Sequence, residues 1–253
     1  ISSNGKEYLI SFDKLGLLKI ASLKFPEIDE KAIKEFIGYC KKNGYIYQII
    51  SFEEMNFLKN YYDGFTNVID LTSPKFQKGI RCNIKKAIKE NVEIRKLETW
   101  EEWEKQNEIH NSLLERKEIS FQEKERLDMY KKLYKLNNKN TVLYGAFHNN
   151  KMIAGTLIAY TKEYGLFFKS ATLKDYYSLA PGPLIIKKIC DNETKRFKYL
   201  DMNIGIEGKY KTSEDVLRII TFKKRFGHEK KIYIYSPKWY LKVKRIKKDI
   251  KNG

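Results

Sequence analysis

Residues 141–173 read TVLYGAFHNNKMIAGTLIAYTKEYGLFFKSATL, and this stretch decides the fold. Three runs rich in β-branched and aromatic residues, 141–147, 152–160 and 165–173, are separated by short turn signals. Asn149-Asn150 lies in the first turn, and Gly165 closes the second. The pattern predicts three consecutive strands that pair as an antiparallel meander.

The residues after this meander alternate between helical and extended patterns. Pro183 opens an apolar-periodic segment over 183–198, followed by the short apolar run 199–205. A second helical segment ends at Gly227, and 231–237 (KIYIYSP) again predicts a strand. When two strands of one sheet are joined through a helix, that helix must cross one face of the sheet. The order therefore predicts the α+β class, with one mixed sheet and helices on both of its faces.

The first 70 residues repeat this order faintly. A strand pair ends at Pro26, a helix over 29–42 ends at Asn43-Gly44, and 45–51 predicts a strand. The helix places Ile33, Phe36, Ile37 and Cys40 on one face. We therefore expect residues 1–70 to form a partial copy of the complete domain at 71–253.

Three helices are predicted between these regions. Ser73-Pro74 has the preferred order of a helix start, and Asn91 ends that helix. Its apolar stripe consists of Phe76, Ile80, Ile84, Ala87 and Ile88, while its other face is lysine-rich. Thr99 begins a capping box for a helix that buries Trp103, Ile109 and Leu113. The third helix is predicted at about 121–136, and its apolar stripe consists of Leu127, Tyr130, Leu133 and Tyr134.

Composition limits the class of protein. With 253 residues and 42% hydrophobic content the chain is long enough to bury a core. It has no apolar run of membrane-spanning length and no signal-like start, so we expect a cytoplasmic protein. The chain begins at Ile1, so an N-terminal segment is expected to be missing. Three widely spaced cysteines, Cys40, Cys82 and Cys190, predict buried free thiols, and the three histidines lack metal-ligand spacing.

The formal net charge of +18 favours association with polyanions. Nucleic acid, a nucleotide-linked substrate and an anionic membrane surface all fit this charge. A lysine-rich proteome would produce the same composition without any anionic partner.

Several segments together resemble one family of acyltransferases. These are YGAFHNNKMIAGTLIAY (144–160), FFKSAT (167–172), LAPGPLIIKKI (179–189), FKYLDMNIG (197–205) and ITFKKRFG (220–227). In this order they resemble the second domain of the Fem-type (FemABX-like) peptidyltransferases and the related BioF2-like acetyltransferase domains of the GNAT superfamily. KGIRCNIKKAIKENVEI (78–94) is similar to the basic helix that opens that domain. The resemblance implies a GNAT-like sheet from Asp70 to the C-terminus and a reduced GNAT-like half before it.

The resemblance also implies site residues. Lys223 matches the lysine of the family's Phe-Lys-x-x-Phe-Gly motif, which acts on the negative charge that develops during acyl transfer. Arg116 matches a family arginine, although the accompanying threonine is not evident. Phe168 stands where the family has a tyrosine that contacts the acceptor, and this departure puts the usual acceptor in doubt.

Other candidates come from their positions in the sequence. Asp201, in the run 199–205, is the candidate that binds or deprotonates the acceptor amine, and loop capping is its structural alternative. The remaining candidate substrate-binding residues are Arg81, Lys85, Tyr177, Asn203 and Tyr210. Lys223 and Asp201 are the expected catalytic residues. No metal and no cofactor are expected.

The turn at Pro181-Gly182-Pro183 bears on the donor. An acyl-CoA-dependent GNAT enzyme binds pyrophosphate here through the N–H groups of a glycine-rich helix start. Pro183 removes one such donor, and the turn has a single glycine. The sequence therefore favours aminoacyl-tRNA over acyl-CoA as the donor.

The leading hypothesis is an aminoacyl or peptidyl transferase. It would move an amino acid from aminoacyl-tRNA to an amine on a nucleotide- or lipid-linked cell-wall peptide precursor. No motif of an activated nucleophile is present, so direct attack without a covalent intermediate is expected. An acyl-CoA-dependent N-acyltransferase acting on an amino sugar or small amine is one alternative. A non-catalytic RNA- or membrane-binding GNAT-like module is the other, and contact with an anionic membrane remains open.

Overall fold

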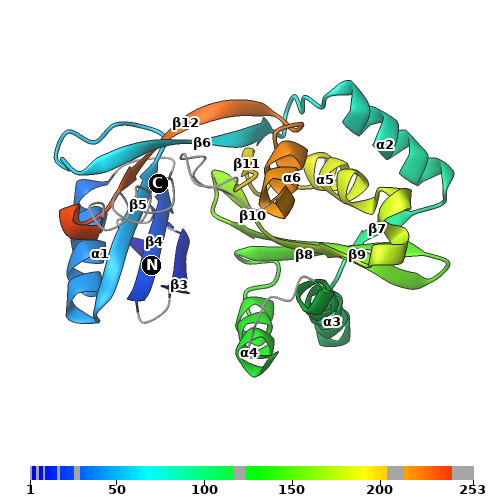
Figure 1. Ribbon diagram of the computed structural model, residues 1–253, viewed down its shortest axis with the longest axis horizontal. Helices are drawn as coiled ribbons and strands as arrows, with labels where there is room; N and C mark the ends of the chain where they lie inside the picture. Colours follow the sequence, from blue (N-terminus) through cyan, green and yellow to red (C-terminus); the bar gives the residue numbers. More distant parts are fainter. Residues whose placement is uncertain are drawn as a thin grey trace. The chain divides into compact units, whose positions relative to one another are not determined.

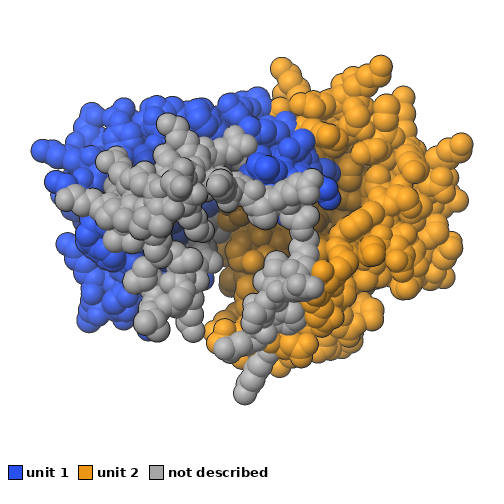
Figure 2. Space-filling model, in the orientation of Figure 1, with its two compact units in different colours: residues 1–68, 204–224, 228–253 blue, residues 69–203, 225–227 orange. Residues whose placement is uncertain are grey.

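The computed structural model describes residues 2–3, 6–7, 9–15, 18–25, 29–116, 123–203 and 214–240. The chain forms two compact units, which Figure 2 shows in different colours. Unit 1 comprises residues 1–68, 204–224 and 228–253, and unit 2 comprises residues 69–203 and 225–227. The separation of the chain at residue 70 into two GNAT-like halves stays a prediction, since a compact unit is not evidence of a repeat.

Unit 1 is built around a mixed sheet with the strand order β3-β4-β5-β12-β6 (Figure 1). Its strands are β1 (Ser2–Ser3), β2 (Lys6–Glu7), β3 (Leu9–Leu15), β4 (Leu18–Phe25), β5 (Tyr45–Ser51), β6 (Tyr61–Asp70) and β12 (His228–Tyr235). Its helices are α1 (Glu30–Lys42) and α6 (Glu214–Lys223). β4 and β5 are parallel, whereas β12 is antiparallel to both β5 and β6. β1 and β2 form a separate two-stranded pair.

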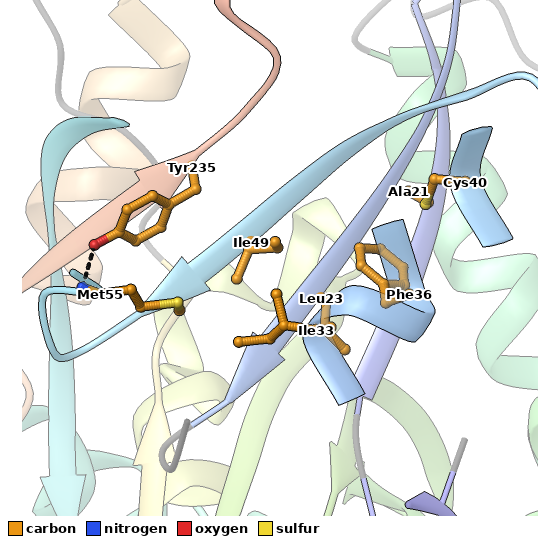
Figure 3. Close-up of a cluster of buried hydrophobic side chains, with 8 residues drawn as sticks. All are labelled: Ala21, Leu23, Ile33, Phe36, Cys40, Ile49, Met55 and Tyr235. Atoms are coloured by element: carbon orange, nitrogen blue, oxygen red, sulfur yellow. Dashed lines mark hydrogen bonds between the residues drawn. The ribbon is translucent and has the colours of Figure 1, made fainter. Parts of the chain in front are cut away.

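The core of unit 1 lies between α1 and this sheet (Figure 3). Its fully enclosed members are Ala21, Leu23, Ile33, Phe36, Cys40, Ile49, Met55 and Tyr235. The Tyr235 hydroxyl accepts a hydrogen bond from the Met55 N–H at 2.5 Å, so strand β12 is fixed to the loop after β5. The predicted stripe of α1 is confirmed at Ile33, Phe36 and Cys40.

The C-terminal end of α1 follows the predicted Asn43-Gly44 signal, and its N-terminal end has a side-chain cap. The Asp29 side chain caps the helix by accepting from the Lys31 and Ala32 N–H groups. Gly44 takes a φ of +69°, the left-handed conformation that ends the helix. The C-terminal end of α1 was therefore predictable from local sequence.

Unit 2 contains the stretch 141–173 and its neighbours, with the strand order β11-β10-β9-β8-β7. Its strands are β7 (Glu93–Lys96), β8 (Thr141–His148), β9 (Lys151–Tyr160), β10 (Tyr164–Thr172) and β11 (Tyr199–Asp201). Its helices are α2 (Lys78–Lys89), α3 (Trp100–Arg116), α4 (Glu123–Tyr134), the 3₁₀ helix η1 (Lys174–Leu179) and α5 (Pro181–Asn192). β10 and β11 are parallel, and the other pairs are antiparallel.

The meander β8-β9-β10 confirms the central prediction. Its first turn has positive φ values at Asn149 (+49°) and Asn150 (+61°), which suit a tight hairpin. The mixed sheet, the helices and the α+β class are also as predicted. In both units a strand, a helix and a parallel strand follow one another: β4-α1-β5 and β10-α5-β11.

Helices cover both faces of the unit 2 sheet, with α2 and α5 on one side and α3 and α4 on the other (Figure 1). Successive side chains of β8 point to opposite faces of the sheet and contact the helices on each side. Leu143 packs with Trp103 of α3, whereas the hydroxyl of the next residue, Tyr144, donates to Glu193 after α5 at 2.5 Å. The predicted capping box of α3 is present, because Thr99 and Glu102 each bond the other's N–H.

Glu193 is a buried carboxylate that fixes the C-terminal end of α5. Lys96 of β7 lies 2.8 Å from it, and Arg196 lies 3.4 Å from it. Burial, followed by the nearby Glu193, raises the pKa of Tyr144, so its hydroxyl stays protonated and donates. Glu193 therefore joins the end of α5 to β7 and β8, and two cations, Lys96 and Arg196, lie beside its negative charge.

The predicted start of α2 is wrong. The helix begins at Lys78 instead of after Ser73-Pro74, because the preceding segment pairs with a distant one. Phe76 forms an antiparallel bridge with Phe226, and the two rings contact edge-to-face at 5.7 Å. The Gln77 N–H donates to the Arg225 carbonyl, which keeps these residues extended.

Smaller predictions also fail. Helix α5 begins at Pro181 instead of Pro183 and ends at Asn192 instead of continuing to residue 198, because residues 193–197 form a turn on the Glu193 carbonyl. Four side chains predicted to be buried are exposed: Ile88, Ile219, Trp239 and the thiol of Cys82. Thr212 and most of the predicted last helix lie outside the described residues.

Candidate functional site

The carboxyl ends of β10 and β11 define the candidate site in unit 2. The two parallel strands pair only from Tyr164↔Tyr199 to Leu166↔Asp201, although β10 continues to Thr172. On its other side β10 has a bulge between Phe167 and Lys169. The two strands therefore stop pairing at the carboxyl end of β11, and the carboxyl ends of parallel strands are common ligand-binding positions.

Asp201 occupies this point and is 9% exposed. One carboxylate oxygen accepts a hydrogen bond from the Asn203 N–H at 2.7 Å, and Asn203 has a φ of +52°. This is the loop-capping geometry that we gave as the structural alternative for Asp201. The structure thus brings two predicted site residues, Asp201 and Asn203, into contact.

Phe168, the predicted acceptor-contacting position, is the extra residue at the β10 bulge. Its half-buried ring packs against the apolar cluster under α3, which includes Trp103 and Leu157. The Lys169 ammonium lies 5.3 Å from the centre of the Phe168 ring. The bulge therefore turns two consecutive side chains, Phe168 and Lys169, to the α3 side of the sheet.

The N-terminus of α5 is poor in hydrogen-bond donors. Ala180 precedes the helix with a φ of +52°, and Pro181 and Pro183 both lie in its first turn. A helix start normally offers several free N–H groups, but neither proline has one. The expected weakness of a pyrophosphate site is thus larger than a single proline at 183 would cause.

Arg116 and Tyr177, both predicted to bind substrate, contact each other although they are 61 residues apart in the chain. The Arg116 guanidinium donates to the Tyr177 hydroxyl and lies 5.2 Å from the ring centre. Arg116 is the last residue of α3, and Tyr177 lies in η1, just before α5. Both side chains are exposed. The contact therefore fixes an exposed ring near the start of α5.

Helix α2 packs against α5 and η1 and carries the predicted cations Arg81 and Lys85. Arg81 donates to the Phe76 carbonyl at 2.8 Å, which holds the turn before the helix. The exposed cations of the helix are Lys78, Arg81, Lys85, Lys86 and Lys89. Among the described residues no carboxylate forms an ion pair with the four lysines.

The remaining predicted residues are not part of this group. Lys223 is the half-buried last residue of α6 and belongs to unit 1. Tyr210 lies outside the described residues. Whether Lys223 and Asp201 act together stays a prediction.

The sequence reasoning missed a buried polar cluster between α3, α4 and the sheet. Gln106, Asn107 and His110 of α3 are buried, as are Arg126 and Tyr130 of α4. The Tyr130 hydroxyl lies 3.4 Å from His110 Nδ1. Burial, with smaller contributions from Lys169 and Arg126, lowers the pKa of His110 to about 4. Polar residues at buried positions of the α3 stripe were the available signal.

The described residues contain no group of three or more His, Cys, Asp or Glu side chains arranged to hold a metal ion. None of their helices is both long and apolar enough to cross a membrane.

Three solved structures have a fold similar to that of this chain. The structure of FemX aligns with a TM-score of 0.62 at 9% sequence identity, covering 95% of this chain and 88% of FemX. L-PGS from Bacillus licheniformis aligns with a TM-score of 0.58 at 15% identity, covering 93% and 82%. The C-terminal domain of a putative lysylphosphatidylglycerol synthetase from Agrobacterium fabrum gives 0.59 at 14% identity, covering 93% and 81%.

No protein-family model and no curated protein matches the chain. At these identities the structural likeness shows the fold alone, and the expectation of a fold like that of FemX is confirmed at that level.

Proposed function

We propose that this protein is an aminoacyl transferase that takes an amino acid from aminoacyl-tRNA and passes it to an amine on a cell-wall peptide precursor. The observation that carries the proposal is the first turn of α5. Pro181 and Pro183 remove N–H groups at the position where acyl-CoA would need them. This helix start therefore favours a donor other than acyl-CoA.

The cations of α2 support a polyanionic donor. Helix α2 contains five cations and no acid within Lys78–Lys89, and it packs beside η1 and α5. Phosphate groups bound to such cations release counterions, which supplies affinity that depends on salt. The fold similarity to FemX and to two lysylphosphatidylglycerol synthetases agrees with an aminoacyl transfer reaction.

The reaction needs one bond exchange. The acceptor nitrogen attacks the ester carbonyl of the donor, forming an amide C–N bond and breaking the C–O bond to the RNA ribose. The amine gives up a proton, and the leaving ribose oxygen takes one. In our proposal Asp201 accepts or relays the proton of the amine. The expected role of Lys223, stabilising the negative oxygen of the tetrahedral intermediate, stays a prediction.

A second acceptor class follows from the comparisons. Two of the similar structures are L-PGS and the domain of a putative lysylphosphatidylglycerol synthetase, so we propose a lipid hydroxyl as the alternative acceptor to a peptide amine. The donor chemistry is the same in both cases.

The test combines ligand binding with product formation. We expect charged tRNA to raise the unfolding midpoint while acetyl-CoA leaves it unchanged. A ligand at a hundredfold excess over its Kd stabilises the native state by about 2.7 kcal/mol. Transfer of a radiolabelled amino acid from the tRNA pool to a UDP-linked muramyl peptide, or to phosphatidylglycerol vesicles, then identifies the acceptor. Stabilisation by acetyl-CoA alone would refute the proposal.

A further inference from the structure

The Arg116–Tyr177 pair is unusual because its aromatic ring is held by a neighbouring side chain without being buried. Tyr177 is 50% exposed, and among the described residues of unit 2 it is the one aromatic side chain with such large exposure. The guanidinium lies over the ring and also donates to its hydroxyl. An exposed tyrosine gains little from this arrangement by burial, so the contact serves to orient the ring.

Fixed aromatic rings and arginine planes are the surfaces on which unpaired nucleobases stack. Proteins that bind single-stranded RNA combine such a ring with nearby cations that follow the phosphates. Both parts occur here on adjoining elements, since η1 with Tyr177 packs against α2 with its row of lysines.

The charges around the two parts differ. Helix α2 has five cations and no acid, whereas each exposed acid beside the ring has an exposed cation next to it in the chain: Asp175 follows Lys174 in η1, and Glu115 precedes Arg116. Phosphates are therefore favoured along α2, and an uncharged base is favoured at the ring. This division matches a strand whose backbone lies along α2 and whose terminal base reaches η1.

We infer that Tyr177, held by Arg116, is a stacking platform for an unpaired nucleobase near the aminoacylated 3′ end of the donor RNA. The inference rests on the proposed function and assigns a positioning role for the donor to two residues. It places the base close to the first turn of α5, which directly follows η1.

The experiment measures binding of two short single-stranded RNAs carrying a 5′ fluorescent label. One has a normal 3′ nucleotide and the other has an abasic 3′ nucleotide. The variants are Tyr177→Leu, Tyr177→Phe and Arg116→Ala. Tyr39→Leu is the matched control, because Tyr39 is also an exposed tyrosine, 42% exposed, on α1 of unit 1. Since all these positions are exposed, the variants should fold, and their unfolding midpoints check this.

We expect Tyr177→Leu to weaken binding of the normal RNA about tenfold or more, the effect typical of losing one base–aromatic stack. Tyr177→Phe should keep most of the affinity, and Arg116→Ala should fall between the two. Binding of the abasic RNA should be equally weak for wild type and Tyr177→Leu, because the base and the ring form one interacting pair. Tyr39→Leu should bind both RNAs like the wild type.

Three results would overturn the inference. If Tyr177→Leu weakens both RNAs equally, the ring does not act through the base. If it changes neither while charged tRNA still stabilises the protein and acyl transfer occurs, the platform is wrong although the proposed function stands. If neither RNA nor charged tRNA binds the wild type, the proposed function fails and the platform fails with it.

Discussion

At the scale of single residues, Asp201 combines a structural contact with a proposed chemical one. Its carboxylate already accepts from the Asn203 N–H, and it lies where two parallel strands stop pairing. A substitution that removes the whole side chain would therefore confuse a loop effect with a catalytic effect. The two can be separated, because an asparagine at this position retains an oxygen for the Asn203 N–H.

We predict that Asp201→Asn lowers the rate of acyl transfer by about 10²- to 10⁴-fold, the usual contribution of a positioned general base. Its unfolding midpoint should stay close to that of the wild type, because the loop hydrogen bond is kept. Asp201→Ala should lose both activity and some stability. Single-turnover transfer rates and thermal melts measure the two effects, and full activity of Asp201→Asn would remove this residue from the mechanism.

His110 gives a pH-dependent prediction. Its pKa is about 4 in the folded protein and 6.5 as an ordinary value, so between these pH values the unfolded chain binds the additional proton. The stability of unit 2 should therefore fall as the pH falls from about 6.5 to 4, by about 3 kcal/mol in total. Above pH 6.5 this residue should cause no further change.

Urea titrations of wild type and His110→Gln at pH 7 and pH 5 test this prediction. The variant should lose much of the pH dependence, since glutamine does not titrate. His228→Gln changes an exposed histidine and should keep the slope of the wild type. An unchanged slope in His110→Gln would show that other groups cause the pH dependence.

At the scale of elements, α2 is a helix whose own electrostatics are unfavourable. Lys78 stands at its N-terminal end, where the helix dipole disfavours a cation, and no side chain caps it. Arg81, Lys85 and Lys89 follow one another at spacings of four residues, which brings like charges together on one face. The helix forms because Ile80, Ile84 and Ala87 are buried on the opposite face.

We predict that Lys78→Glu and Lys85→Glu stabilise the protein slightly, each by about 0.3–1 kcal/mol. The same changes should weaken RNA binding and reduce the slope of log K against log salt. Lys131→Glu, on α4, is the control for a charge change on another helix. Unchanged RNA affinity in both α2 variants would show that the cations of this helix do not contact the donor.

The C-terminal end of α5 gives an element-scale prediction about stability. Removing the Glu193 carboxylate leaves the buried Tyr144 hydroxyl without its acceptor and the partly exposed Lys96 and Arg196 without their shared partner, so Glu193→Ala should cost about 1–3 kcal/mol. Asp191→Ala breaks only the exposed pair with Lys187 and should cost less than about 1 kcal/mol. Denaturant midpoints compare the two, and similar losses would contradict the buried network.

At the scale of the whole molecule, the sequence predicted what depends on local pattern. The strands of the meander, the C-terminal end of α1 and the capping box at Thr99 follow from alternation, turn residues and caps within a few positions. The errors come from distant partners. The start of α2 depends on a bridge between Phe76 and Phe226, which are 150 residues apart in the chain.

In the candidate site, too, individual residues could be predicted from the sequence but contacts between distant residues could not. Arg116, Tyr177, Asp201 and Asn203 were predicted one by one from motif positions, but the contacts between them were not. The contact of Arg116 with Tyr177 requires the end of α3 and the start of α5 to meet at one edge of the sheet. The buried set around His110 was overlooked, because a polar residue in an apolar stripe does not show by itself which groups will surround it.

Strand β12 lies between β5 and β6, although it is made from residues 228–235. On the ribosome, β5 and β6 emerge long before the strand that separates them, while residues 69–203, nearly all of unit 2, are complete before β12 is synthesised. Two open strand edges must therefore wait during translation, and such edges are prone to pair wrongly. The nascent chain should accordingly acquire protease resistance first in its middle and last at its beginning, the reverse of the order in which it is made.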